Sequence, residues 1–320
     1  MEKNKGNNVP NFHRNQSGKS YILLWLFLVC LYSVIPYAVF ASSPILVETI
    51  IPRGDEETGE INPGAIAVTT DGVIYLTDPG RNRILKLAPD GRVLDTRGRF
   101  GWQPEEYDVP ADIALAQNLN LYVADYNNSR LQMYDRNMNF IRTVPLENAD
   151  EGVVYYPLSV DQAPGGWLYV LDTEQNQILQ LNPQGNLLQS LGTFTELGRF
   201  MQNASKMQVS PKGNLWVLAE RTGKILIFDR FGTLKRTVRD SSITSPVGVA
   251  FAPKSNYVLN RTRVLTRISS KDFFPEKTLA LQLEESQNAT DITAARGVLY
   301  ILATNPPEIY VYRIDASRGE

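Results

Sequence analysis

Short apolar runs, each holding one aromatic residue and flanked by turn-forming residues, recur along the chain from residue 73 onward. The aromatic positions are Tyr75, Tyr122, Tyr169, Trp216, Tyr257 and Tyr300. Successive aromatics are separated by 47, 47, 47, 41 and 43 residues. Runs of this length and composition predict β-strands. A nearly constant period of this size indicates one structural unit repeated six times.

Each unit predicts four short antiparallel strands. A first apolar strand begins eight or nine residues before the aromatic and follows a proline in four units: Pro63, Pro110, Pro157 and Pro246. Turn residues such as Asp71-Gly72 separate it from the aromatic strand, and a third strand begins at Arg83-Ile84 in the first unit. Such residues favour tight hairpins. Repeated four-stranded units predict an all-β six-bladed β-propeller, because one small sheet cannot bury both its faces alone. The blades are expected near 63–97, 110–144, 157–191, 204–238, 246–283 and 289–315, within a domain spanning 42–320.

The last unit is one strand short. Only six residues follow its third strand, which ends at Ile314. Residues 44–51 alternate apolar and polar side chains, and Ile45, Val47 and Ile51 are expected to face the core. We therefore expect this N-terminal strand to close the sixth blade and remove an exposed sheet edge.

The N-terminal region predicts export. Residues 1–20 are basic, and residues 21–41 form an uncharged apolar stretch of a length that can span a bilayer. The sequence Val39-Phe40-Ala41 and the upstream Pro36 favour a cleaved signal peptide that leaves Ser42 at the new terminus. A retained transmembrane anchor is the alternative. In either case the propeller is expected in the periplasm, outside the cell or at its surface, and any membrane contact would come from residues 21–41.

Composition narrows the chemistry. The net charge is −2, which gives no electrostatic indication of nucleic-acid binding. The one cysteine is Cys30 and the one histidine is His13, so residues 42–320 have neither a thiol nor an imidazole. Disulfide, thiol and imidazole chemistry are thereby excluded from the predicted propeller.

The repeat resembles the NHL family of propellers. That family shows a strand led by proline, a glycine turn, an aromatic strand ending in aspartate, and then an Asn-x-Arg-Ile motif. Residues 62–68 (NPGAIAV), 71–78 (DGVIYLTD) and 81–84 (RNRI) follow this pattern, and residues 121–131 (LYVADYNNSRL) repeat it. The resemblance implies a binding scaffold. Related lyases use histidine, which this propeller lacks, whereas calcium-dependent lactonase-like propellers use acidic and amide side chains in the central channel.

Candidate binding residues lie where the first strands should line the channel. The charged positions there are Asp112, Asp161, Lys206 and Asp291. They differ from blade to blade, as a specific site on a symmetric scaffold requires. The alternative is a channel lining in which Lys206 pairs with Asp112 or Asp291. On the first interpretation, replacing Asp112 or Lys206 with alanine should weaken partner binding and change stability by less than about 1 kcal/mol, as near-surface substitutions do.

A basic rim and a recurring acidic position are further candidates. Arg83 and Arg130 lie in predicted loops near the channel mouth, where they could bind an anionic partner or pair with nearby acids. Asp78, Asp125 and Asp172 recur at the ends of the aromatic strands. They could hold a cation, or they could accept hydrogen bonds from their own turns.

The sequence favours an exported, non-catalytic scaffold that recognises a protein or glycan, neutral or anionic, through one face of the propeller. No cofactor is required. The alternative is a calcium-dependent hydrolase with Asp112, Asp161 or Asp291 as ligands, and an assembly factor is a third possibility.

Overall fold

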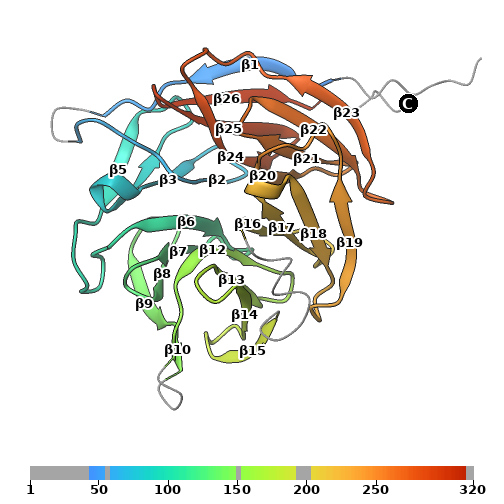
Figure 1. The fold of residues 1–320 in the computed structure, drawn as a ribbon. Helices are drawn as coiled ribbons and strands as arrows, with labels where there is room; N and C mark the ends of the chain where they lie inside the picture. Colours follow the sequence, from blue (N-terminus) through green and yellow to red (C-terminus); the bar gives the residue numbers. More distant parts are fainter. Residues whose placement is uncertain (1–42, 55–57, 149–152, 192–202, 315–320) are drawn as a thin grey trace, which may run out of the picture. The chain divides into compact units, whose positions relative to one another are not determined.

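Six four-stranded antiparallel sheets are arranged around a central axis in the computed structural model (Figure 1). The structure describes residues 43–54, 58–148, 153–191 and 203–314. The predicted targeting segment at residues 1–41 lies outside these ranges. Within the described ranges, no helix is long and apolar enough to cross a membrane.

The sheets are numbered as blades 1 to 6, and the four strands of each blade are called a, b, c and d from the axis outward. In blades 1 to 5 these strands follow one another in sequence. Blade 1 contains β2 (Ile66–Val68), β3 (Ile74–Asp78), β4 (Arg83–Leu87) and β5 (Val93–Arg97). Blade 2 contains β6 (Pro110–Leu115), β7 (Leu121–Asp125), β8 (Arg130–Tyr134) and β9 (Phe140–Pro145). Blade 3 contains β12 (Pro157–Gln162), β13 (Leu168–Asp172), β14 (Gln177–Leu181) and β15 (Leu187–Leu191).

The second half repeats this order. Blade 4 contains β16 (Ala204–Val209), β17 (Leu215–Ala219), β18 (Lys224–Phe228) and β19 (Leu234–Arg239). Blade 5 contains β20 (Pro246–Phe251), β21 (Ser255–Asn260), β22 (Val264–Ser269) and β23 (Pro275–Ala280). Blade 6 contains β24 (Asn288–Ala295), β25 (Val298–Thr304), β26 (Glu308–Arg313) and, as its outer strand, β1 (Ile45–Ile50). A small hairpin, β10 (Glu147–Asn148) and β11 (Val153–Val154), connects blades 2 and 3, and 3-10 turns occur at Pro79–Arg81 and Glu220–Thr222.

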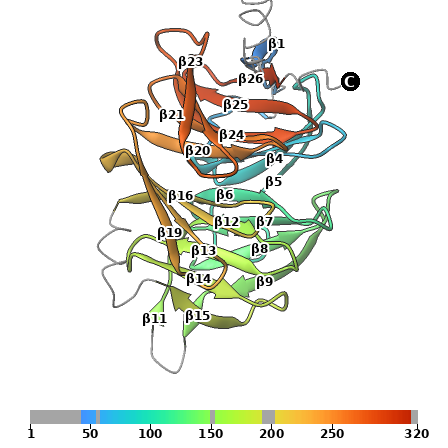
Figure 2. The ribbon, with the colours of Figure 1, turned by 90° about the vertical axis from the view of Figure 1, so that its right-hand side faces the viewer.

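The expected closure of blade 6 is confirmed. β1 pairs antiparallel with β26, from Ile45 opposite Arg313 to Ile50 opposite Ile309 (Figures 1 and 2). The expected inward face of β1 is wrong, because the register shifts between Leu46 and Glu48. Ile45, Val47 and Ile51 are about half exposed, whereas Ile50 is buried and Leu46 packs against the core.

Each interface between neighbouring blades contains a hydrophobic cluster. Val160 and Leu168 of blade 3, for example, pack with Leu131 and Val144 of blade 2. The interface between blades 6 and 1 is filled in the same way by Leu302 and Val311 with Leu76 and Leu85, and Ile50 of β1 joins it. Burial of apolar side chains between sheets is the main stabilising contribution in such a fold.

The repeated aromatic of the second strand has a second role besides packing. The Tyr75 hydroxyl donates to the carbonyl oxygen of Arg136 at 2.5 Å, and the Tyr169 hydroxyl donates to that of Arg230 at 3.1 Å. Each acceptor lies in the c–d turn of the following blade. The aromatic period seen in the sequence therefore includes a hydrogen bond between adjacent blades in these two cases.

Candidate functional site

The six inner strands β2, β6, β12, β16, β20 and β24 line the central channel (Figure 1). Each inner strand begins at the face that carries the b–c turns and the connections between blades, here called the b–c face. Each ends at the face that carries the a–b and c–d turns, here called the a–b face. The four charged channel candidates lie on four of these strands: β6, β12, β16 and β24.

Three of those charges form one buried cluster. The Lys206 ammonium lies 2.7 Å from Oδ1 of Asp112 and 3.0 Å from Oδ2 of Asp291. Both carboxylates are almost fully buried, and only 12% of the Lys206 side chain is exposed. Burial alone would lower the pKa of Lys206, but the charges of Asp112 and Asp291 outweigh burial and raise it. The expectation that these residues lie near the surface is therefore wrong, and the paired-charge interpretation holds.

The same carboxylates connect the inner strands to one another. Oδ2 of Asp112 accepts a hydrogen bond from the Val160 amide of blade 3 at 3.1 Å and another from the Ser159 hydroxyl. Oδ2 of Asp291 accepts one from the Ile66 amide of blade 1 at 3.1 Å. The inner edge of each sheet has no further strand to pair with, and an unpaired buried amide costs free energy. Asp112 and Asp291 satisfy such amides across blade boundaries, which is a structural role.

A second tier lies two residues further along the inner strands. Oδ2 of Asp161 accepts the Val209 amide of blade 4 at 2.7 Å, and its Oδ1 accepts the Gln162 amide at 2.8 Å. The side-chain carbonyl of Gln208 accepts the Val249 amide of blade 5 at 3.0 Å. Within the described residues Asp161 has no ion-pair partner, in contrast to Asp112 and Asp291. Burial raises the pKa of Asp161 to about 7, although the two backbone amides act in the opposite direction.

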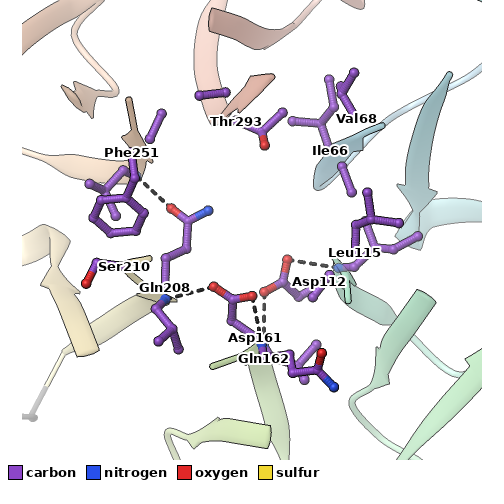
Figure 3. Close-up of a pocket in the computed structure, with 18 of the residues that line it drawn as sticks. Ile66, Val68, Asp112, Leu115, Asp161, Gln162, Gln208, Ser210, Phe251 and Thr293 are labelled. Atoms are coloured by element: carbon purple, nitrogen blue, oxygen red, sulfur yellow. Dashed lines mark hydrogen bonds between the residues drawn. The ribbon is translucent and has the colours of Figure 1, made fainter. Parts of the chain in front are cut away.

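A cavity of about 350 Å³ occupies the channel between this cluster and the a–b face (Figure 3). Asp112 and Lys206 form its inner end, and residues of the a–b turns, including Pro164 and Pro211, form its rim. Aliphatic residues and Phe251 are among its lining residues (Ile66, Val68, Leu115, Val160 and Val209), but the surface that faces the cavity is more polar than apolar. Asp161 and Gln208 extend into its open centre.

Arg83 and Arg130 do not face solvent. Arg130 donates from Nε to Oδ2 of Asp125 at 2.8 Å, and Arg83 donates from Nε to Oδ2 of Asp78 at 2.9 Å. Both arginines are buried, with 8% and 7% of their surface exposed. Their remaining donors bind backbone carbonyls of the segments that precede their own blades. They therefore offer no basic rim to an anionic ligand, and the alternative interpretation of pairing with strand-end acids is correct for both.

The strand-end aspartates also serve the fold. Asp78 and Asp125 bind Arg83 and Arg130, whereas Asp172 accepts the amide of Glu174 in its own turn at 3.1 Å. Each of the three aspartates therefore bonds within its own region of the protein, although Oδ1 of Asp78 is buried without a hydrogen-bond partner among the described residues.

The donor set of the channel does not suit calcium. Calcium needs six to eight oxygen ligands, but the Lys206 ammonium occupies the space between the Asp112 and Asp291 carboxylates. Across the described ranges, no group of three acidic, histidine or cysteine side chains is arranged to hold a metal ion. The described channel residues therefore do not fit the calcium-dependent alternative.

A solvent-facing feature lies on the b–c face, in the connection between β5 and β6. Phe100 and Trp102 are 63% and 69% exposed. The segment folds back on itself, with the Tyr107 amide donating to the Arg99 carbonyl at 2.8 Å. The b–c turn of blade 2 holds it from the side, because the Asn128 amide group donates to the Gly101 carbonyl at 2.8 Å. Sequence reasoning missed this feature, although two aromatics in a polar connection were a visible signal.

Fold and channel together define a propeller scaffold in which three of the four channel charges are paired with one another. A family model for the NHL repeat matches residues 107–134, which extend from the end of this connection through β8. The chain is a six-bladed β-propeller, as the sequence pattern predicted, and one of its repeats matches the NHL family model.

Curated relatives match a limited part of the chain. NHL repeat-containing protein 3 from Mus musculus is 33% identical over 78 residues, covering 23% of this chain and 22% of that protein. Its counterpart from Homo sapiens is 32% identical over 78 residues with the same coverage. Protein SUPPRESSOR OF QUENCHING 1, chloroplastic, from Arabidopsis thaliana is 31% identical over 107 residues, covering 29% of this chain and 10% of that protein. The matched region thus spans less than a quarter of each relative's length.

Solved structures share the fold over most of the chain. A streptogramin B lyase superposes with a TM-score of 0.56 at 14% identity, covering 86% of this chain and 87% of that one. A catalytically inactive histidine-to-alanine variant of virginiamycin B lyase from Staphylococcus aureus, with quinupristin, gives a TM-score of 0.57 at 13% identity, covering 87% and 90%. At these identities the likeness concerns the fold alone.

Proposed function

We propose that this propeller is an exported, non-catalytic recognition module that binds a protein partner through its b–c face. The observation that carries the proposal is the exposed pair Phe100 and Trp102 in a connection whose backbone is fixed by hydrogen bonds from buried side chains. Large exposed aromatics on a fixed backbone are typical of residues that dominate protein–protein binding energy.

The rigidity comes from the buried Arg130. Its guanidinium donates to the carbonyl oxygens of Trp102 at 2.6 Å, Gln103 at 2.9 Å and Glu106 at 2.8 Å. Gln132 adds a donor to the Glu106 carbonyl at 2.6 Å and an acceptor for the Glu105 amide at 2.8 Å. A connection fixed in this way loses little conformational entropy when it binds, and this favours affinity.

The surroundings favour a protein over a sugar as the partner. Arg99 precedes Phe100 in the same connection; its side chain is 82% exposed, and its guanidinium lies 2.7 Å from the Glu106 carboxylate. Tryptophan and arginine together are the side chains most enriched at binding hot spots. We therefore expect a partner with an apolar pocket for Trp102 and a polar rim around it.

The pairing of three of the four channel charges supports the non-catalytic part of the proposal. Residues 42–320 have no histidine, and the channel charges that could act on a substrate include three that are paired with one another. Asp161 is the remaining channel carboxylate, and its two oxygens accept the backbone amides of Gln162 and Val209.

The double substitution Phe100→Ser with Trp102→Ser should weaken partner binding at least thirtyfold and leave the melting temperature unchanged, because both side chains are exposed. The partner is captured on the immobilised propeller from an envelope extract, purified, and then titrated by biolayer interferometry. The matched control is Phe231→Ser, an equally exposed aromatic on a c–d turn of the a–b face, which should bind like wild type.

Unchanged affinity of the double variant would overturn the proposal, as would equal loss in the control. A partner whose binding disappears on enzymatic deglycosylation would show that a glycan is recognised instead of a protein.

Export predicts a defined processed chain. The mature protein recovered from the cell envelope or medium should begin at Ser42, because the small residues Val39 and Ala41 fit the positions read by signal peptidase. N-terminal sequencing and intact-mass measurement check this. Recovery of the uncleaved chain from the membrane fraction would show a retained anchor, and recovery from the cytoplasm would contradict export.

A further inference from the structure

The inner end of the channel cavity contains more carboxylates than ammonium groups. Asp112, Asp291 and Asp161 contribute three carboxylates, and Lys206 contributes one ammonium, which contacts Asp112 and Asp291 only. Asp161 accepts one backbone amide on each oxygen, and each carboxylate oxygen can accept a further hydrogen bond. With all four groups ionised, the cluster therefore has two unmatched negative charges, one of which is on Asp161.

The wall around Asp161 determines what could match that charge. The cavity of about 350 Å³ lies within the range of roughly 300–1,000 Å³ typical of small-molecule sites. Ile66, Leu115 and Phe251 surround its open centre, while Asp161 extends into it (Figure 3). An ammonium group suits the carboxylate, and the polar groups of the wall suit a ligand with further hydrogen-bonding groups.

We propose that the channel cavity binds a small organic ammonium ion, with the charged nitrogen on Asp161 and the rest of the ligand along the mixed wall, where Leu115 and Phe251 supply apolar contacts beside the polar groups. This site opens on the a–b face and is independent of the proposed protein-binding surface on the b–c face. Gln208, whose side-chain carbonyl is occupied by the Val249 amide, presents its amide group to the same space and borders the ligand.

The free-energy cost of keeping Asp161 ionised in the folded protein supports this assignment. Its raised pKa, about 7, means that keeping the carboxylate ionised at neutral pH works against folding. The equivalent positions in blades 1, 2 and 5 are Ala67, Ala114 and Ala250, which have no such cost. A partly buried carboxylate without an ion-pair partner is accounted for if a cationic ligand supplies the partner.

Binding should depend on pH in a specific direction. The charged groups that act on Asp161 are Asp112, which raises its pKa, and Lys206, which lowers it. Ionised Asp161 is the binding form, so affinity should rise as the pH increases through 7 and level off above it. By linkage, the bound ammonium should lower the pKa of Asp161.

The test is calorimetric titration of the full chain with phenethylamine at pH 8 and pH 5.5, where phenethylamine remains protonated. Phenethyl alcohol serves as the neutral analogue, and N-acetyl-lysine methylamide represents a lysine side chain of a protein. We expect phenethylamine to bind at least tenfold more tightly at pH 8 than at pH 5.5, and at least tenfold more tightly than the alcohol. A stronger response to the lysine derivative would identify a protein side chain as the source of the ammonium, within the same chemistry.

Asp161→Asn should reduce phenethylamine affinity at least tenfold, whereas Asp71→Asn, which removes an exposed carboxylate from an a–b turn, should not. A carboxyl carbon NMR titration of Asp161 in the unmodified protein gives a readout independent of variant folding, and saturating amine should shift its midpoint to lower pH. Equal binding of amine and alcohol, unchanged affinity in Asp161→Asn, or an unmoved midpoint would each overturn the proposal.

Discussion

Replacing Lys206 with methionine should destabilise the propeller by about 3–5 kcal/mol, the cost of leaving buried charge without its partner. The ammonium lies between Asp112 and Asp291 at 2.7 and 3.0 Å, and both carboxylates are almost completely buried. Methionine keeps much of the side-chain volume but removes the charge, so the two carboxylates would repel each other inside the channel. Urea denaturation at pH 7 measures the change in the free energy of unfolding.

Two comparisons separate charge from packing. Lys212→Met, at an exposed turn position, should change stability by less than about 0.5 kcal/mol. Combining Lys206→Met with Asp112→Asn and Asp291→Asn should recover most of the loss, because asparagine retains an oxygen for the backbone amides without the charge. A loss below about 1 kcal/mol in Lys206→Met would mean that the cluster is solvated and that its structural role is wrong.

The destabilisation of Lys206→Met should also shrink as the pH falls below neutral. Burial already raises the pKa of Asp291 in the intact protein, although Lys206 acts to lower it. Without Lys206 the folded-state pKa rises further above the unfolded value. The penalty is therefore present above that folded pKa and disappears as protons bind.

Deleting residues 43–50 should cost at least about 3 kcal/mol and promote self-association. The deletion removes the outer partner of β26, exposes an unpaired strand edge, and uncovers the core around Ile309 and Val311. A thermal melt and light scattering measure the two effects. Equal melting temperatures for the deleted and full chains would contradict the closure role of β1.

A pair of point variants locates the effect within β1. Ile50→Ala should cost about 2–5 kcal/mol, because Ile50 is 4% exposed and packs between blades 6 and 1. Ile45→Ala should cost less than about 0.5 kcal/mol, because Ile45 is 48% exposed. The reverse order would restore the inward face that the sequence alternation predicted.

The repeat architecture was predictable because each blade repeats a local pattern of turns and alternating strands. The sequence also predicted that β1 closes blade 6, since a count of strands shows one missing. It did not predict which face of β1 is buried, because a single register shift at Leu46 reverses the alternation. Such a bulge depends on the partner strand and has no clear local signature.

The channel charges show a different limit. Lys206 is 94 residues from Asp112 and 85 from Asp291 in sequence, and a repeat pattern places all three on the axis without giving their depth. The sequence left two interpretations open: a ligand-binding site, or pairing of Lys206 with Asp112 or Asp291. The burial of these side chains in the structure favours pairing. Likewise, Arg83 and Arg130 look like surface cations until the segments folded over them are known.

The central claim is tested most directly by the affinity for the captured partner. This affinity is measured in one assay for two variants, one altered at the Lys206 cluster and one altered at Phe100 and Trp102. Recognition is assigned to Phe100 and Trp102, and the Lys206 cluster is assigned to stability. The account predicts that the folded triple variant Lys206→Met, Asp112→Asn, Asp291→Asn binds the partner like wild type, whereas Phe100→Ser with Trp102→Ser loses at least thirtyfold. Loss of binding in the triple variant with full binding in the surface variant would contradict it and return the recognition site to the channel.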